Sequence, residues 1–161
     1  MKESGQTGIR DPRDVVEALA DHEDAIGDLY AAYGVRFRDA ASFWEGISAE
    51  EYGHGSLMRD LAGRPHELDV FVDTARFPLS ELRGATREVR DQIEVAENSR
   101  VTLIEALETA LGFEQEIIER DAYQVFDSDS PTVARVLNHL RVSSERHRDT
   151  LTSYLRRLPR S

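Results

Sequence analysis

Apolar residues recur every three or four positions along four long stretches of this chain, and this spacing restricts the fold more than any other feature. One face of an α-helix repeats at this interval, whereas a half-buried strand alternates at every second residue. The spacing predicts long helices over residues 12–37, 40–62, 102–126 and 131–157. It also predicts a shorter helix over Leu79–Ala96, and a short extended piece at Leu68–Val72. We therefore expect an all-α protein.

Polar and proline residues mark the ends of these helices. Asp11 and Ser130 each precede a proline, as a helix N-cap followed by proline at the first helical position does. Gly63 lies two residues before Pro65, which is typical of a helix end. The loop between the last two long helices is polar and contains residues 127–130.

The first two helices could instead form one. The apolar spacing runs without a phase break from Val16 to Leu61, so residues 12–62 also fit a single long helix. The polar segment 36–39, with Asp39 as an N-cap, favours two helices. The choice matters because an α-helix rises ~1.5 Å per residue. In one continuous helix Glu23 and Glu51 would lie roughly 40 Å apart and could not share a metal ion.

The length of 161 residues suits one domain with one core. We predict a single domain over residues 1–161, with residues 1–11 as a flexible N-terminal segment. Two tight helical hairpins joined by a long crossover, residues 64–101, match the ferritin-like variant of the four-helix bundle. No stretch is long and apolar enough for a membrane span or a signal peptide, so a cytoplasmic location is expected.

Composition narrows the chemistry. The chain has no cysteine, which excludes disulfides, thiolate zinc sites and iron–sulfur clusters. Any metal must be held by oxygen and imidazole ligands. The net charge of −11 argues against nucleic acid as a partner, because phosphate backbones require a basic face.

Each predicted apolar stripe is interrupted near its middle by polar residues that would face the interior: Glu23, Glu51, His54, Glu114, Ser144 and His147. A lone ionised carboxylate in a core costs several kcal/mol unless it is paired. One or two divalent cations are the simplest compensation. Oxygen and nitrogen ligands in this mixture suit iron, manganese or zinc. Glu51 and His54 are three residues apart and therefore lie on one helix face, where both can reach the same ion.

Each of these residues also has an ordinary structural interpretation. Glu23 and Glu114 would be surface carboxylates if the phase of the stripe were shifted by one residue. His54 and His147 could be core histidines bonded to carbonyl groups, and Tyr30 and Tyr33 could be packing residues. Asp121 is expected at an open bundle end. The remaining histidines and several acids are expected to be solvated: His22, His66, His139, Glu50, Glu116, Glu119 and Glu145.

Three of the predicted helices carry motifs at fixed spacing. The first contains Glu23 followed seven residues later by Tyr30. The second reads Phe43-Trp44, then Glu50-Glu51-Tyr52-Gly53-His54, and the third reads Ala106-Leu107, then Ala110 and Glu114. Together, over residues 14–155, they resemble the rubrerythrin type of the ferritin-like di-iron superfamily, without a rubredoxin domain, which has a similar Phe-Trp and Glu-Glu-x-x-His signature.

The resemblance implies two iron ions, with Glu51 as a bridging ligand and Glu23 and Glu114 as terminal or bridging ligands. His54 and His147 would each bind one metal. It further implies peroxidase-like or ferroxidase-like chemistry, a role for Tyr30 in hydrogen bonding or electron transfer, a separate protein as electron donor, and a homodimer.

The last helix departs from the family pattern. The family has a second Glu-x-x-His there, whereas this chain has Ser144 at the Glu position and keeps His147. Glu145 is one residue away, which turns its side chain by roughly 100° around the helix. Three outcomes stay open: a lopsided two-metal site, a single metal, or an empty site. The alternative functions are accordingly non-catalytic metal binding, and a metal-free interaction module.

Overall fold

The computed structural model describes residues 11–64, 71–72, 79–119, 126–127 and 130–159. The helices are α1 (Pro12–Arg36), a single 3-10 turn η1 (Arg38–Ala40), α2 (Ala41–Ala62), α3 (Leu79–Asn98), α4 (Leu103–Glu119) and α5 (Pro131–Arg157). Two strands of two residues each, β1 (Phe71–Val72) and β2 (Phe126–Asp127), pair antiparallel. The all-α class is thus confirmed. No helix among the described residues has the length and apolarity needed to cross a membrane.

The observed helix ends agree with the ends predicted from the sequence in all but two places. Asp11 caps α1 by accepting from the Arg13 amide at 3.0 Å, and Ser130 caps α5 through the Val133 amide at 3.4 Å. Gly63 ends α2. Asp39 was predicted as a cap but lies within η1, and α2 starts without a side-chain cap. The helix predicted over 102–126 is too long, because α4 ends at Glu119 and Phe126 belongs to β2.

Residues 12–62 form two helices and not one rod. The chain leaves α1 at Phe37, turns through η1 and returns along α2. Ser48 then donates to the carbonyl of Gly27 at 2.8 Å and joins the two helices near their middle. Gly55 allows the close approach, because a Cβ at this position would collide with Asp24 of α1. The hairpin therefore brings Glu23 and Glu51 to the same level.

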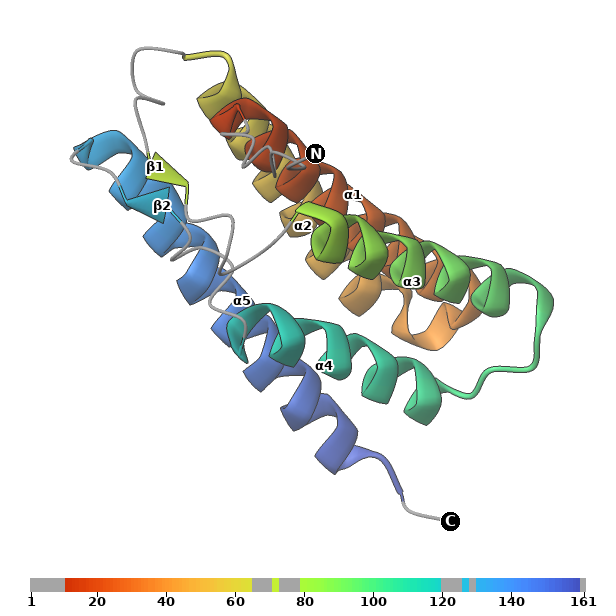
Figure 1. Cartoon of the computed structure of the whole chain (residues 1–161). Helices are drawn as coiled ribbons and strands as arrows, with labels where there is room; N and C mark the ends of the chain where they lie inside the picture. Colours follow the sequence, from red (N-terminus) through yellow and green to blue (C-terminus); the bar gives the residue numbers. More distant parts are fainter. Residues whose placement is uncertain (1–10, 65–70, 73–78, 120–125, 128–129, 160–161) are drawn as a thin grey trace, which may run out of the picture.

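The helices pack against one another in pairs around the α1–α2 hairpin (Figure 1). α1 packs against both α2 and α3, α4 packs against α5, and α5 also contacts α2. Arg36, at the end of α1, donates to the carbonyls of Ala96 and Val101 and so holds the turn between α3 and α4. α4 begins with a capping box in which Thr102 and Glu105 bond each other's amides.

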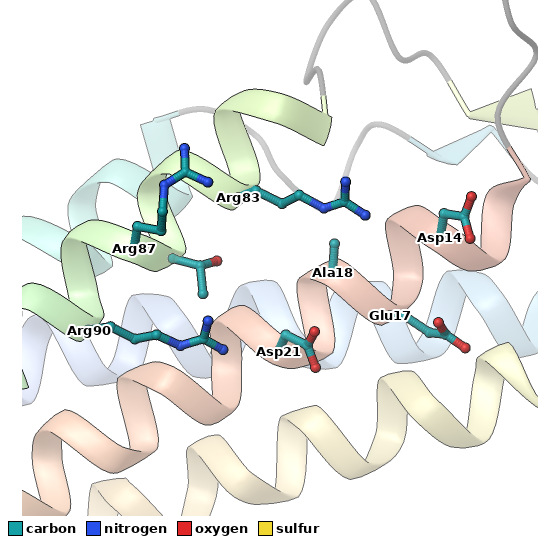
Figure 2. A pocket seen from close by; sticks show the side chains of 8 residues that line it. Asp14, Glu17, Ala18, Asp21, Arg83, Arg87 and Arg90 are labelled. Atoms are coloured by element: carbon teal, nitrogen blue, oxygen red, sulfur yellow. The ribbon is translucent and has the colours of Figure 1, made fainter.

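The α3 helix was predicted at the right place and covers one side of α1. Its buried residues recur at helical spacing and face α1: Leu79, Leu82, Thr86, Val89 and Ala96. Between the exposed edges of α1 and α3 lies a surface hollow of about 350 Å³ (Figure 2). Carboxylates of α1 and guanidinium groups of α3 line it: Asp14, Glu17, Asp21, Arg83, Arg87 and Arg90. α1 is therefore covered by α2 on one side and by α3 on another.

Candidate metal centre

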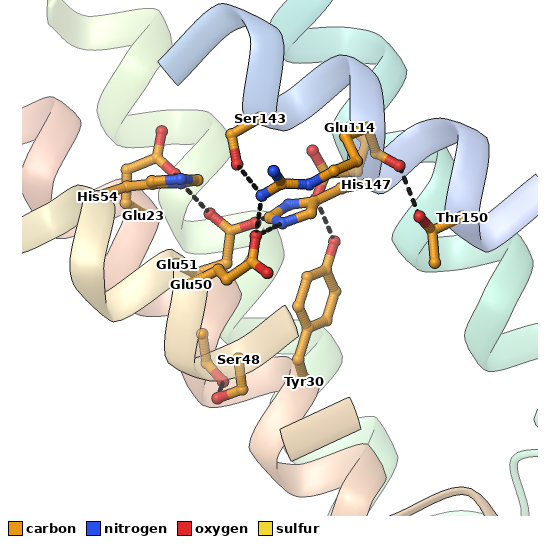
Figure 3. Close-up of polar contacts among 12 residues, drawn as sticks. Glu23, Tyr30, Ser48, Glu50, Glu51, His54, Glu114, Ser143, His147 and Thr150 are labelled. Atoms are coloured by element: carbon orange, nitrogen blue, oxygen red, sulfur yellow. Dashed lines mark hydrogen bonds and ion pairs between the residues drawn. The ribbon is translucent and has the colours of Figure 1, made fainter. Parts of the chain in front are cut away.

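Two groups of buried ligand atoms meet in the interior of the protein (Figure 3). The first consists of Glu23, Glu51 and His54, and the second of Glu51, Glu114 and His147. Within each group the ligand atoms lie within 4.8 Å of one another. The structure therefore brings together all five of the ligands predicted from the sequence, from four different helices. These buried groups could hold a metal ion.

His54 forms the first group with two carboxylates. Its Nδ1 lies 3.0 Å from Glu51 Oε2 and 3.5 Å from Glu23 Oε2. Glu51 and His54 are one helical turn apart on α2, and Glu23 reaches them from α1 across the hairpin. Burial by itself lowers the pKa of His54, but hydrogen bonds to Glu23 and Glu51 outweigh it and raise the pKa to about 9.

His147 forms the second group from α5. Its Nδ1 lies 2.6 Å from Glu51 Oε1 and 3.5 Å from Glu114 Oε1. Burial lowers the pKa of His147, whereas Glu114 and Glu51 raise it, and the net result is a pKa of about 11. The rings of His54 and His147 stack with centroids 5.7 Å apart. Glu51 is therefore shared, with one oxygen on each histidine.

The surroundings of Glu51 disfavour its negative charge. The residue is 2% exposed. Burial, followed by the charge of Glu114, raises its pKa to about 8, although the two neighbouring histidines oppose the shift. A carboxylate in this position requires a positive charge beside it to stay ionised at neutral pH.

The ligand atoms of the cluster are better placed to bind a cation than to form hydrogen bonds with each other. Glu51 Oε1 and His147 Nδ1 are buried and have no hydrogen-bond partner within the described part of the chain, although they lie only 2.6 Å apart. The contact is thus close but lacks hydrogen-bond geometry. Atoms bound to one ion at about 2 Å lie up to about 4 Å apart. The spacing within each group is already near this limit.

Glu50 completes the surroundings of His147 from the surface side. Its Oε2 lies 2.8 Å from His147 Nε2 and also accepts a hydrogen bond from Arg146. Burial raises the pKa of Glu50, but His147 and Arg146 outweigh this and lower it. A ligating histidine commonly donates its second ring N–H to a carboxylate, which sets the tautomer and the ring orientation. Glu50 is placed to do this while Nδ1 faces the candidate metal.

Tyr30 lies beside the second group. Its side chain is fully buried, and the hydroxyl donates to Glu114 Oε1 at 2.8 Å. Burial, with the charge of Glu114, raises the pKa of Tyr30 well above its usual value, so the phenol keeps its proton. Ser144 is buried at the position where the resemblance expects a carboxylate, and it adds no charge to the cluster.

One expectation of a solvated residue needs correction. His22 is buried, not solvated, and its Nδ1 lies 3.0 Å from Thr86 Oγ1 of α3. Burial lowers the pKa of His22, and its nearby carboxylates only partly oppose this. Glu50 is exposed, as expected, yet it also binds His147. His139 is exposed as predicted, and lies edge-on to His54. His66 and Asp121 lie outside the described residues, as does the N-terminal segment 1–10.

One signal could have found the burial of His22. The apolar spacing of residues 79–96 showed that α3 must cover another helix, and the opposite side of α1 carries Val15, Ala18, His22 and Ala25 at the matching spacing. For Glu50 no comparable signal exists, because its partner is 97 residues away.

The fold and the site define an all-helical protein with a buried carboxylate–histidine cluster that could hold metal. Comparisons of the chain with protein-family models, with curated proteins and with solved structures found no match. Assignment of a function therefore depends on the geometry of the cluster.

Proposed function

We propose that this chain is a ferritin-like, rubrerythrin-type metalloprotein that binds two metal ions, with iron as the first candidate and manganese or zinc as alternatives. The observation that carries the proposal is that one buried carboxylate, Glu51, belongs to two ligand groups, each with its own histidine. A single-ion site would need only one such group. The arrangement of α1 with α2, and α4 with α5, supports a ferritin-like bundle.

In this proposal each side chain of the cluster has its own role. Glu23 and His54 would hold one ion, Glu114 and His147 would hold the other, and Glu51 would contribute a ligand to both. Ferrous iron held there would supply electrons to peroxide or dioxygen. The surrounding core excludes bulk water, Glu50 fixes the orientation of His147, and Tyr30 holds a proton against Glu114.

The direct test is metal content followed by reaction. The full chain, loaded anaerobically with ferrous iron, should contain two ions, and addition of peroxide should oxidise both in single turnover. A chain that binds no metal would refute the proposal. If two ions bind per chain but are not oxidised, the proposed metal site would stand and the proposed oxidative chemistry would be refuted.

A second candidate function is non-catalytic metal binding, and Ser144 is the observation that favours it. A buried serine supplies no charge where the resemblance expects a bridging carboxylate, so the cluster has fewer ligands for a second ion. Ser144→Glu should then raise the metal occupancy, whereas Ser144→Ala, the matched control, should not. Unchanged occupancy in Ser144→Glu would count against a weakened two-metal centre.

By the same resemblance we propose that two copies of the chain form a homodimer and that the electron donor is a separate protein. Light scattering of the purified chain tests the first part, and a monomer at micromolar concentration would refute it.

A further inference from the structure

A line of aromatic rings connects the candidate metal centre to the protein surface. Tyr30 of α1 contacts Trp44 of α2 with ring centroids 5.6 Å apart, and Trp44 contacts Phe43 at 5.1 Å. Phe43 then stacks on Tyr154 of α5 at 4.7 Å with an interplanar angle of 22°. Tyr30 and Trp44 have no exposed surface, whereas Tyr154 is half-buried. The line thus begins at a side chain bonded to Glu114 and ends in contact with solvent.

We propose that the Tyr30–Trp44–Phe43–Tyr154 line carries single electrons from the surface to the candidate metal centre. The proposal rests on the proposed oxidative function for its direction, but the conduction itself is a property of the side chains. Phenol and indole rings can give up one electron, and contacts between neighbouring rings keep each transfer short. A phenylalanine ring is much harder to oxidise, so Phe43 acts as a bridge between Trp44 and Tyr154.

The first transfer is coupled to a proton. Tyr30 gives one electron to the oxidised centre and its phenolic proton to Glu114, to which it is already bonded at 2.8 Å. Trp44 then gives one electron to Tyr30, whose phenol recovers the proton from Glu114. Trp44 is left with a positive charge.

The remaining transfers bring the electron in from outside. Tyr154 gives one electron to Trp44 across Phe43 and releases its phenolic proton to water. A one-electron donor in solution then reduces Tyr154, which takes a proton back. The net change is one electron from the donor to the centre, with no bond of the protein altered.

The hydroxyl partners of Tyr30 and Tyr33 explain why the line runs through Tyr30. The Tyr30 hydroxyl donates to the carboxylate of Glu114, which can take its proton. Tyr33 lies even closer to Trp44, at 4.9 Å, but its hydroxyl bonds Thr109 and not a carboxylate. Without a base to take the proton, Tyr33 cannot replace Tyr30, and it provides a matched control.

The test can be made without any metal, because the chain has no cysteine of its own. Ser153→Cys, at an exposed position next to Tyr154, accepts a ruthenium photo-oxidant as a single label. Repeated flashes in air should oxidise Trp44, although it is inaccessible to solvent, and peptide mass spectrometry measures the yield. The control label at exposed Ser56→Cys lies twelve residues along α2 from Trp44, or ~18 Å along the helix.

The expected result is oxidised Trp44 with the Ser153→Cys label and a loss of that product in both Phe43→Leu and Tyr154→Phe. The Ser56→Cys label should give little of it. No oxidation of Trp44, or equal oxidation with and without Phe43 and Tyr154, would overturn the proposal. Two variants are used so that a change in packing at one position cannot decide the outcome.

Single turnover of the iron-loaded chain separates this proposal from the function on which it rests. If peroxide fails to oxidise the loaded iron, the proposed oxidative chemistry is refuted, while the metal-free experiment still decides the electron path. If oxidation occurs, re-reduction by a soluble one-electron donor should be slower in Trp44→Phe and Tyr30→Phe, and unchanged in Tyr33→Phe. Equal re-reduction rates in all four proteins would overturn the path.

Discussion

α1 carries acidic residues on two sides, and the negative charge of these residues is balanced differently on each side. On the outer side Asp14, Glu17 and Asp21 share a surface hollow with three arginines of α3 (Figure 2), so three carboxylates meet three guanidinium groups. On the inner side Glu23 joins Glu51 and Glu114, and of the described residues two histidines face these three carboxylates (Figure 3). The inner charge is −3 with neutral imidazoles and −1 with both protonated.

The comparison shows what distinguishes a site from a charged surface. The outer acids are exposed, and water and fixed cations offset them. The inner acids are at most 2% exposed, and the protein supplies too little positive charge to offset them. An incomplete charge balance in a dry position is costly, so an added cation would lower that cost. Three substitutions, not counting their controls, and two changes of the solution test this difference.

Metal binding should give the largest effect. Because the folded inner cluster is the only place where these ligands converge, an added ion stabilises the folded state. At a free metal concentration ~1,000 times Kd the gain is about 4 kcal/mol in the free energy of unfolding. Urea unfolding with ferrous iron or zinc, and with a chelator, measures it. Identical curves in both solutions would contradict a metal role for the inner cluster.

Glu51→Gln should have the next largest effect, because both ligand groups lose a carboxylate at once. We expect the affinity for both ions to fall by more than the ~10–100-fold that loss of an outer hydrogen-bond partner costs. Glu23→Gln is the matched control and should lower the affinity for one ion only. Calorimetric titration distinguishes the two, and unchanged affinities in Glu51→Gln would remove Glu51 from the site.

The metal-free protein should lose stability as the pH rises. Glu51 has a pKa raised from 4.5 to about 8, and the pKa values of His54 and His147 are raised from 6.5 to about 9 and about 11. In all three cases the folded state holds more protons than the unfolded state, so stability falls as pH increases through these windows. Each group contributes at most about 1.4 kcal/mol per pH unit.

Unfolding at several pH values between 5 and 9 measures this loss, and Glu51→Gln should flatten the part of the curve below about pH 8. A stability that rises with pH over this range would mean that the charges of the inner cluster are compensated in another way.

Glu50→Gln should have a moderate effect confined to the second group. The amide keeps the shape but can no longer act as a charged acceptor for His147 Nε2, so we expect metal affinity at this half to fall ~10–100-fold. Glu145→Gln, a neighbouring acid that pairs with Arg141 at 2.9 Å, is the control and should not change the affinity. Equal effects of both substitutions would point to general surface charge.

Arg90→Ala on the outer side should have the smallest effect. Its guanidinium is exposed and solvated, so the free energy of unfolding should change by no more than about 0.5 kcal/mol and the metal affinity should not change. Thermal unfolding and metal titration check both values. A loss of metal affinity would show that the two sides of α1 are coupled through the buried His22–Thr86 contact.

Much of the fold and the cluster could be predicted from the sequence because both follow from helical periodicity. Glu51 and His54 had to share a face, and Glu23 and Tyr30 had to be two turns apart on another. The length of α4 could not be predicted in this way. The apolar spacing continues past Glu119, yet Phe126 pairs with Val72 in a strand, and a contact over that separation has no local signal.

The sequence by itself determined which side chains face the interior, because a helix repeats its faces at a constant interval. It also determined that any metal must be bound by oxygen and imidazole, since the chain has no thiols. Only the tertiary structure decided that α3 is the helix that covers His22 of α1, and that Glu50 lies 2.8 Å from His147. Those outcomes depend on how helices are placed beside one another, and periodicity along one helix carries no information about its neighbours.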